Sequence, residues 1–368
     1  MRPRGLYIHI PFCKQKCNYC DFASFAGKEQ ARQRYLCALE KEAAAYADPS
    51  YTTLYVGGGT PSLLTVPQLQ TLGRMVTKYF GPVAHFVEST FEANPESLTA
   101  EKIACLRALG FNRLSMGLQS FHDTELKTLG RVHNAAQFLT AYQAAHRGGF
   151  ENINVDLIAG VPGQSLQSFS TGLGRLVEVN PKHISVYGLQ IEEGTPFFAQ
   201  GVTCDQGLMR QMLEKAHEVL TQSGYHHYEI SNYAKPGYES KHNTLYWQNG
   251  SYLGLGSAAA SYQKGVRRQN EPGLEAYISC VEAGEKPTAF SERLTGKAKE
   301  GENLFLALRQ LDGTELTARQ RAWFGAEIER HVKNGLLTQA GKKVKLSKEG
   351  LYLANEVFRS FVAPFEDA

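Results

Sequence analysis

The sequence predicts an α/β fold, a partial (β/α)6 barrel of the TIM type followed by a smaller C-terminal domain that is helical and resembles a winged helix. Two observations predict the barrel. Short apolar runs rich in β-forming residues alternate strictly with amphipathic helical patterns, and six such pairs occupy residues 1–224. Strict alternation of this kind is typical of a parallel sheet covered by helices. An open doubly wound sheet is the second choice.

The barrel is expected to contain six strands and six main helices. The strands are expected at Leu6–Ile10, Thr53–Val56, Phe86–Phe91, Arg113–Leu118, Ile153–Ile158 and His183–Leu189. The helices are expected at Lys28–Tyr46, Val66–Phe80, Thr99–Leu109, Ala135–Arg147, Leu166–Val179 and Gly207–Ser223. Gly110 and Gly224 follow two of these helices directly, as helix-ending glycines commonly do.

The pattern changes after residue 224. Residues 225–291 are rich in Tyr, Gly and Asn and show weak periodicity, so we expect a connecting segment, with one edge strand around His226 and His227 that exposes one of the two histidines. Residues 292–368 are expected to form the C-terminal domain. Its elements are helices at Glu302–Leu311 and Thr317–Asn334, a hairpin around Gly341, and a last helix from Ser347 to about Phe361.

The charge balance limits the classes of partner. The 368 residues carry a formal net charge of +3, which gives no electrostatic reason to expect a nucleic acid or an anionic membrane. The lysines near the hairpin are therefore interpreted as a solvated surface rather than a nucleic-acid contact. No run of about 18 apolar residues predicts a membrane span. The apolar stretch near the start is too short for a signal peptide, so we expect a cytoplasmic protein.

Three of the seven cysteines form a C-x₃-C-x₂-C run: Cys13, Cys17 and Cys20. An odd total with this clustering is not a secreted disulfide framework, and clustered thiols in a reducing compartment more often hold metal. Three thiolates can ligate three irons of a [4Fe–4S] cluster and leave the fourth iron open. A Cys₃His zinc site with His9 as fourth ligand is the rival, and buried unliganded thiols are the third interpretation.

Polar signals follow the other expected strands in the same register. Glycines and a threonine follow the second strand, and single polar residues lie at or near the ends of the later ones. These residues are Gly58, Gly59, Thr60, Glu92, Gln119, Asp156 and Gln190. Ligand-binding groups of parallel barrels gather at the carboxyl ends of the strands, so together the seven residues indicate one site. Each alone would be explained by a cap or a buried hydrogen bond.

The motifs together give the chain a family resemblance. It resembles the radical SAM (S-adenosylmethionine) superfamily, in the branch that contains oxygen-independent coproporphyrinogen III oxidases and haem chaperones, and within that branch it is most similar to the chaperones. The resemblance covers nearly the whole chain and rests on Tyr7–Cys13, the cysteine run, Gly57–Ser62, Glu92–Pro95, Gly117–Phe121, Leu129–Arg131 and Asn154–Pro162.

The resemblance implies cofactors and their contacts. In the family, a reduced [4Fe–4S] cluster supplies an electron that cleaves SAM, while the protein orients and shields the product radical. By resemblance, the side chains or backbone of Tyr7, Tyr19, Gly58 and Glu92 contact the cluster-bound SAM, and Gly58, Gly59 and Thr60 hold its methionine amino end. Gln119, Arg131, Asp156 and Gln190 match positions that line a second SAM or substrate site in the oxidase.

Two features distinguish oxidase from chaperone. The oxidase has a further cysteine two positions after its last cluster cysteine, and here that position is Phe22. The chaperone branch carries an H-N-x-x-Y-W motif, which stands here as His242–Trp247. His is a natural axial ligand of haem iron, and Tyr246 and Trp247 offer flat apolar surface. A hydrogen-bonding role for His242 in an aromatic turn is the alternative.

The resemblance therefore predicts a haem chaperone that binds a [4Fe–4S] cluster, SAM and haem. Its expected partners are an electron donor for the cluster and haem-accepting proteins, respiratory ones among them, with membrane contact only through those acceptors. Oxygen-independent coproporphyrinogen III oxidation is the alternative enzyme function. A structural metal-binding interaction protein is the third hypothesis.

Overall fold

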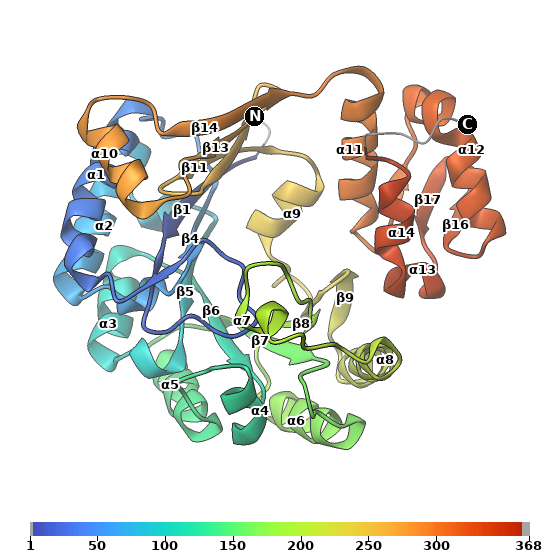
Figure 1. Ribbon diagram of the computed structural model, residues 1–368, viewed down its shortest axis with the longest axis horizontal. Coiled ribbons are helices and arrows are strands. Elements are labelled where there is room, and N and C mark those ends of the chain that lie inside the picture. The colour runs from blue at the N-terminus through green and yellow to red at the C-terminus, as the bar shows by residue number, and fades with distance from the viewer. Residues whose placement is uncertain (1–2, 363–368) are drawn as a thin grey trace.

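A 12-stranded sheet forms the centre of the computed structural model, which describes residues 3–362. Its middle strands are the six that the sequence predicts. They are β1 (Arg4–Ile10), β4 (Thr53–Gly58), β5 (Glu88–Ala93), β6 (Arg113–Gln119), β7 (Asn152–Ala159) and β8 (His183–Gly188). Neighbours among them pair in parallel in chain order. The prediction of a partial barrel is confirmed, and its strands curve around a common interior (Figure 1).

Helices cover the outer face of this sheet (Figure 1). They are α1 (Arg32–Ala45), α2 (Val66–Phe80), α3 (Ala100–Leu109), α5 (Ala135–Arg147), α6 (Leu166–Val179) and α8 (Gln206–Gln222). Capping boxes at Thr65, Asn134 and Ser165 explain why three of them begin where they do, because each side chain accepts a hydrogen bond from the backbone of the first turn. Their apolar faces pack against the strands in one large core. Two short helices, α4 (Asp123–Thr128) and α7 (Pro196–Ala199), lie in the loops.

Residues 225–293 extend the sheet at both ends, which the weak periodicity did not indicate. At one end β9 (His226–Glu229) and β10 (Asn232–Ala234) are antiparallel, and β9 is the edge strand that was expected, with His226 exposed and His227 buried. At the other end β11 (Ser251–Leu255) pairs in parallel with β1. Beyond it lie β12 (Ala260–Gln263), β13 (Val266–Asn270) and β14 (Thr288–Arg293), and α10 (Leu274–Glu282) packs on α1. The limits 1–224, 225–291 and 292–368 stay a prediction.

Helix α9 (Lys241–Trp247) lies in the opening between the first and last barrel strands (Figure 1). The buried carboxylate of Glu88, at the start of β5, accepts hydrogen bonds from the backbone N–H of Lys241 and of His242, both at 2.9 Å. A carboxylate at a helix start satisfies donors that have no partner within the helix. Glu88 thereby fixes α9 to the barrel.

The C-terminal part has a core and a sheet of its own. Its elements are α11 (Gly296–Leu308), β15 (Thr314–Glu315), α12 (Ala318–Lys333), β16 (Leu337–Ala340), β17 (Lys343–Leu346), α13 (Lys348–Tyr352) and α14 (Ala354–Arg359). This order of helices, hairpin and helix is the expected winged-helix-like arrangement. Two details differ from the prediction: α11 begins earlier and ends at Leu308, and the last helix is broken at Leu353.

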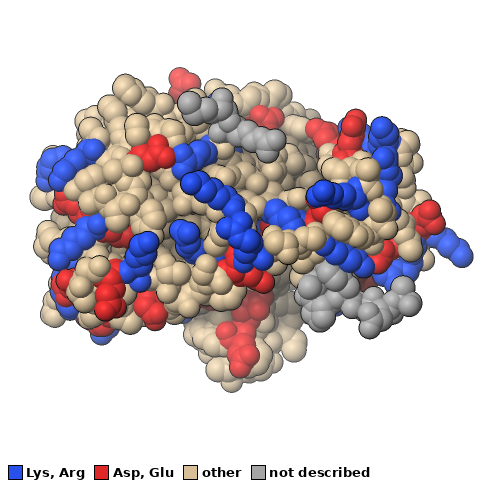
Figure 2. Space-filling model, turned by 90° about the horizontal axis from the view of Figure 1, so that it is seen from above, with Lys and Arg blue, Asp and Glu red and all other residues tan. Residues whose placement is uncertain are grey.

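The surface carries both signs of charge. Figure 2 shows Lys and Arg interspersed with Asp and Glu over the face seen from above, in keeping with the small net charge. Between residues 3 and 362, none of the helices is both long and apolar enough to cross a membrane.

Candidate cofactor site

A cavity of about 370 Å³ opens at the carboxyl ends of the barrel strands. It brings together most of the predicted site residues. Those that line it are Cys13, Cys17, Tyr19, Cys20, Gly58, Gly59, Thr60, Glu92, Gln119, Arg131, Asp156 and Gln190. Tyr7 and His242 do not line it. We call this space the cysteine cavity.

The cysteine loop between β2 (Phe12–Cys13) and β3 (Phe25–Ala26) is anchored through Asn18 to the end of α4. The backbone N–H of Asn18 donates to the carbonyl of Leu129, and its side-chain amide donates to that of Thr128. All three thiols are free and half-buried. Burial, the largest effect, and the neighbouring thiols of Cys17 and Cys13 together raise the pKa of the Cys20 thiol to about 11. A cation placed beside Cys20 would favour its thiolate form.

The loop at the end of β4, Gly57–Ser62, packs directly on the cysteine loop, and we call it the glycine loop. Gly59 N donates to the carbonyl of Ile10, and Thr60 N donates to that of Phe12. A Cβ on Gly59 would lie 2.7 Å from the carbonyl oxygen of Phe12 and 3.0 Å from Cys13 Sγ. Gly58 has φ of 117°, and a Cβ there would meet the ring of His9 at 2.5 Å. These contacts explain why the loop needs glycine at both positions.

Glu92 connects the glycine loop to the barrel interior. Its Oε2 accepts from Gly58 N at 3.0 Å, and its Oε1 accepts from the hydroxyl of Tyr55 at 2.6 Å. Burial raises the pKa of the Glu92 carboxyl to about 7, against the opposing effect of these hydrogen bonds. A carboxyl group with a pKa near 7 is partly ionised at neutral pH. At the wall of the cavity it suits a cationic ligand such as SAM.

Arg131 lies against Cys17. Its guanidinium nitrogens are 3.6 Å from Cys17 Sγ, 2.8 Å from Asn94 Oδ1 and 3.1 Å from the carbonyl oxygen of Gly117. A buried cation at this distance stabilises thiolate charge. Asn94 also donates to Thr60 Oγ1 at 3.2 Å, so it links Arg131 to the glycine loop. The sequence motif contained Asn94, but nothing in the pattern indicated this linking role.

Gln119 and Asp156 lie deeper in the cysteine cavity. Gln119 has φ of 70°, in the left-handed region that a residue with a side chain adopts at a cost of about 1–3 kcal/mol, most often at functional sites. Asp156 Oδ1 accepts from the side chain of Asn154 at 2.8 Å, and burial raises the pKa of its carboxyl. Gln190 is exposed and lies at the rim.

The floor of the cysteine cavity is polar, a feature that sequence reasoning missed. Arg113 is one of the most buried side chains and contacts Thr90 Oγ1. The ring of His183 bonds Asn154 Oδ1 at 2.6 Å on one side and the hydroxyl of Tyr228 at 2.8 Å on the other. A charged residue at an inward-facing strand position is unusual in a packed barrel, and Arg113 at the start of β6 was the available signal.

Tyr7 and His9 lie on the wall of a second cavity, of about 600 Å³, that also borders the cysteine loop. The phenol of Tyr7 bonds His9 Nδ1 at 2.8 Å, and His9 Nε2 bonds the carbonyl of Ala23 at 2.8 Å. Because the carbonyl can only accept, Nε2 carries the proton and Nδ1 accepts from Tyr7. With both nitrogens engaged, His9 holds the end of the cysteine loop and is not free to ligate zinc.

His242, in the first turn of α9, is fully buried and lines neither cavity. Its Nδ1 bonds Thr53 Oγ1 at 2.8 Å and its Nε2 bonds the hydroxyl of Tyr246 at 2.7 Å. Burial lowers the pKa of its imidazole to about 3. Haem iron could reach either nitrogen only after a hydrogen bond breaks, so axial ligation by His242 stays a prediction that requires a rearrangement.

The thiols of Cys13, Cys17 and Cys20 share one wall of the cysteine cavity, and both ring nitrogens of His9 are engaged in hydrogen bonds elsewhere. Three thiol donors without His9 as a fourth ligand fit a [4Fe–4S] cluster that keeps one iron open.

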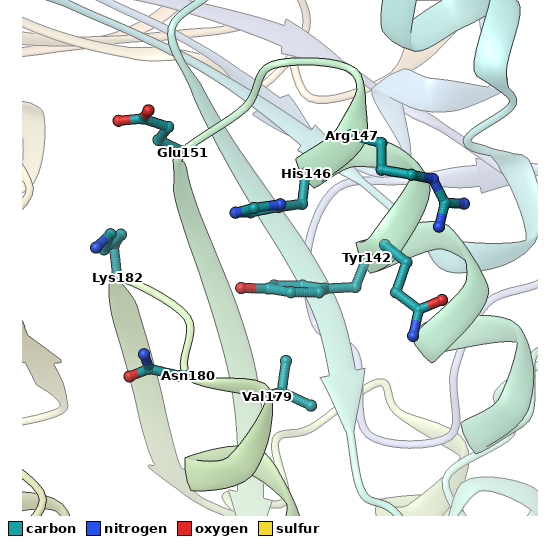
Figure 3. Close-up of a pocket in the computed structure, with 8 residues that line it drawn as sticks. Tyr142, His146, Arg147, Glu151, Val179, Asn180 and Lys182 are labelled. Atoms are coloured by element: carbon teal, nitrogen blue, oxygen red, sulfur yellow. The ribbon is translucent and has the colours of Figure 1, made fainter.

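A third hollow lies at the opposite, amino ends of β7 and β8 (Figure 3). The rings of Tyr142 and His146 project into it side by side from α5, while Glu151 and Lys182 stand before the two strands. None of the predicted site residues lines it. This hollow is therefore separate from the cysteine cavity, which lies at the carboxyl ends of the barrel strands.

The cysteine loop, the glycine loop and the strand-end residues around one end of a partial barrel define a radical SAM protein. Residues 7–171 match the family model described as the radical SAM superfamily. Among solved structures, coproporphyrinogen III oxidase (HemN) from Escherichia coli is similar with a TM-score of 0.86 and 25% identity, over 98% of this chain and 90% of that one.

Curated relatives show which family within the radical SAM superfamily the chain belongs to. The proteins named heme chaperone HemW from Bacillus subtilis and Lactococcus lactis are 35% and 32% identical, each over 98% of this chain and over 99% and 98% of their own lengths. The protein of that name from Escherichia coli is 41% identical over 70% of this chain and 69% of its own. The chain belongs to the heme chaperone HemW family.

Proposed function

We propose that this protein is a haem chaperone that binds a [4Fe–4S] cluster, SAM and haem, and passes haem to acceptor proteins. The observation that carries the proposal is the full-length likeness to proteins named heme chaperone, in a chain whose cysteine cavity retains all three thiols. Phe22, exposed at the cavity edge where the related oxidase has a further cysteine, favours carrying a porphyrin over modifying one.

Cys13, Cys17 and Cys20 would hold the cluster, and its open iron would bind the amino and carboxylate groups of SAM. The backbone of Gly58 and Gly59, with Thr60, would hold the methionine end. Tyr19, Glu92 and Arg131 would enclose the ligand and keep water out. When it is bound and reduced, the cluster supplies the electron for reductive cleavage of SAM. An external electron donor is then required to reduce the cluster.

Haem binding is proposed to involve the segment His242–Trp247. Because His242 bonds the hydroxyl of Tyr246, it can support haem through Tyr246 without touching the iron. The acceptors are proposed to be haem proteins, respiratory ones among them. The cytoplasm is the proposed location, with membrane contact only through acceptors.

The test is a haem titration of the reconstituted wild type, His242→Ala and His242→Gln, with His85→Ala as a control at an exposed histidine. We expect His242→Ala to weaken haem binding about tenfold at unchanged cluster absorbance, with an unchanged Soret position if His242 acts through Tyr246 and partial rescue by His242→Gln. A changed Soret position would show ligation by His242. Equal affinity in wild type and His242→Ala would remove His242 from haem binding.

Coproporphyrinogen III oxidation is the second candidate, favoured by the likeness to the solved oxidase along nearly the whole chain. Anaerobic protein with reductant, SAM and coproporphyrinogen III distinguishes the two. The proposal predicts no decarboxylated product while SAM remains bound. Turnover to protoporphyrinogen would replace the chaperone function with the oxidase function.

A further inference from the structure

The walls of the second cavity differ from those of the cysteine cavity. It lies between strands β1, β11, β12 and β13 on one side and helices α9 and α11 on the other. Five of its lining residues present aromatic rings: Tyr7, Phe22, Tyr246, Trp247 and Tyr252. Tyr246 and Trp247 belong to the motif His242–Trp247, and Tyr7 belongs to the motif at the start of the chain. Tyr252, Ala260 and Arg267 come from strands β11–β13, which the sequence did not reveal.

Its dimensions and walls suit a flat, largely apolar ligand. A volume of about 600 Å³ lies within the range of cavities that enclose cofactors. The edge-to-face packing of Tyr246 on Tyr252, with centroids 4.6 Å apart, holds two of the rings in place. Small residues such as Ala258 and Ala260 leave the space between the rings open. Aromatic faces contact a planar macrocycle over a wide area.

One cation lies on the strand side of this cavity. Arg267 Nε donates to Glu302 Oε2 at 2.6 Å, and its Nη1 is 3.5 Å from the hydroxyl of Tyr252. A guanidinium has five N–H donors, so these two contacts leave donors for the carboxylates of a ligand. The neighbouring Arg268 lies on the other face of β13 and does not line the cavity.

Backbone strain marks the same place. Among described residues other than glycine, five have positive φ, and two of them line this cavity: Asn249 at 49° and Ala258 at 57°. Alanine gains nothing from a left-handed conformation, and such strain persists mainly where function requires it. Gln119, a third member of the set, lines the cysteine cavity, so three of the five border the two cavities.

The two cavities share a wall. Asp21 and Phe22, directly after the last cluster cysteine, line both. His9 fixes this wall through the carbonyl of Ala23. A ligand in the second cavity therefore lies beside the cysteine loop.

We infer that haem binds in the second cavity, with its ring between the α9 aromatics and the β11–β13 face and its propionates directed to Arg267. The inference rests on the proposed haem-chaperone function and adds the place where haem lies. His242 is outside this cavity, and Ala260, Arg267 and Tyr252 are inside it.

The first experiment fills the cavity. Ferric haem is titrated into the cluster-loaded wild type, Ala260→Trp and Ala289→Trp; both alanines are exposed strand residues, and Ala289 lies on β14 outside the cavity. We expect Ala260→Trp to bind haem at least tenfold more weakly and Ala289→Trp to match wild type, with equal cluster absorbance and unfolding midpoints. Equal haem affinity in Ala260→Trp would overturn the site.

The second experiment removes the positive charge of Arg267. It does not require the fold to accommodate a larger side chain. Arg267→Gln is compared with Arg268→Gln, an identical charge change one residue away on the opposite face. Weaker haem binding in Arg267→Gln alone supports the site, and equal affinities in the two variants contradict it. If the wild type binds no haem, the proposed function itself fails. If the wild type and every variant bind haem alike, only the cavity is wrong.

Discussion

At the scale of single residues, two glycines at the cysteine cavity allow one backbone segment to approach another closely. Gly59 and Gly58 allow the glycine loop to lie against Cys13 and His9 at distances that a side chain would prevent. Glu92 and Arg131 then place one carboxyl and one guanidinium on the wall beside that loop. The site is therefore an arrangement of backbone contacts first and of charged side chains second.

Gly59→Ala tests the backbone contact. The new Cβ would meet the carbonyl of Phe12, which cannot move without shifting the cysteine loop. We expect a loss of about 1–3 kcal/mol in the free energy of unfolding and reduced iron content after anaerobic reconstitution. Gly174→Ala on α6 is the control, because nothing lies within 4 Å of its Cβ and alanine favours a helix. Full iron retention in Gly59→Ala would contradict the packing argument.

Glu92→Gln tests the carboxyl. Because the pKa of Glu92 is raised to about 7, the anionic form appears as pH rises through that value. Wild-type affinity for the cationic ligand SAM should increase between pH 6 and 8. The affinity of Glu92→Gln should be flat over that range and about tenfold weaker at pH 8, as expected for one charge-assisted hydrogen bond. Calorimetry of SAM binding measures both affinities, with Glu101→Gln, at an exposed residue of α3, as the control. Parallel pH curves in wild type and Glu92→Gln would exclude a role of Glu92.

At the scale of elements, α9 determines how the interior is divided. It closes the opening of the barrel, contributes Asn243 to the cysteine cavity and contributes Tyr246 and Trp247 to the second one. Arg309 beyond α11 stacks on the Trp247 ring at 4.2 Å, and Asn249 donates to Glu302. One short helix thus joins the barrel, both cavities and the C-terminal part.

Glu88→Ala tests the attachment of α9 to the barrel. Loss of the Glu88 carboxylate leaves the buried N–H groups of Lys241 and His242 without their acceptor. We expect a decrease of about 2–4 kcal/mol in the free energy of unfolding, from a lost cap and unsatisfied donors. Denaturant unfolding measures it against Glu101→Ala, where a change below about 0.5 kcal/mol is expected. Similar losses in the two variants would show that Glu88 does not fix α9.

The elements also show what the sequence could predict. The six barrel strands and their helices follow from apolar periodicity and caps, and α2, α5 and α6 match their predicted limits. Strand β13 escaped prediction because the charged residues Arg267 and Arg268 occupy both of its faces, so no alternation results, and β11 and β12 are short runs of mixed polarity. The second cavity could not be predicted for the same reason. His242 was identified by its motif, but only tertiary structure shows that Thr53 and Tyr246 occupy both its nitrogens.

For the whole molecule, buried histidines make stability depend on pH. Burial, the largest effect, and the nearby His217 together lower the pKa of His227 from 6.5 to about 4. In acid the unfolded chain therefore takes up a proton before the folded chain does. The stabilisation is complete above about pH 6.5 and is lost as pH falls toward 4.

His227→Gln tests this dependence. Between pH 7.5 and pH 5 the wild type should lose about 2 kcal/mol more unfolding free energy than His227→Gln loses. Its neighbour His226 is exposed, so His226→Gln should keep the wild-type pH dependence. Urea unfolding at the two pH values measures the difference. A wild-type slope that His227→Gln leaves unchanged would assign the acid sensitivity to other groups.

The central claim is that one chain combines a SAM-binding [4Fe–4S] cluster with a haem site. The most direct measurement is anaerobic reconstitution of the whole chain, followed by iron analysis, electron paramagnetic resonance of the reduced protein with and without SAM, and a haem titration of the same sample. We expect four irons per chain, a cluster signal that SAM alters, and one haem bound per chain. Zinc in place of iron, a signal that SAM leaves unchanged, or the absence of haem binding would contradict it.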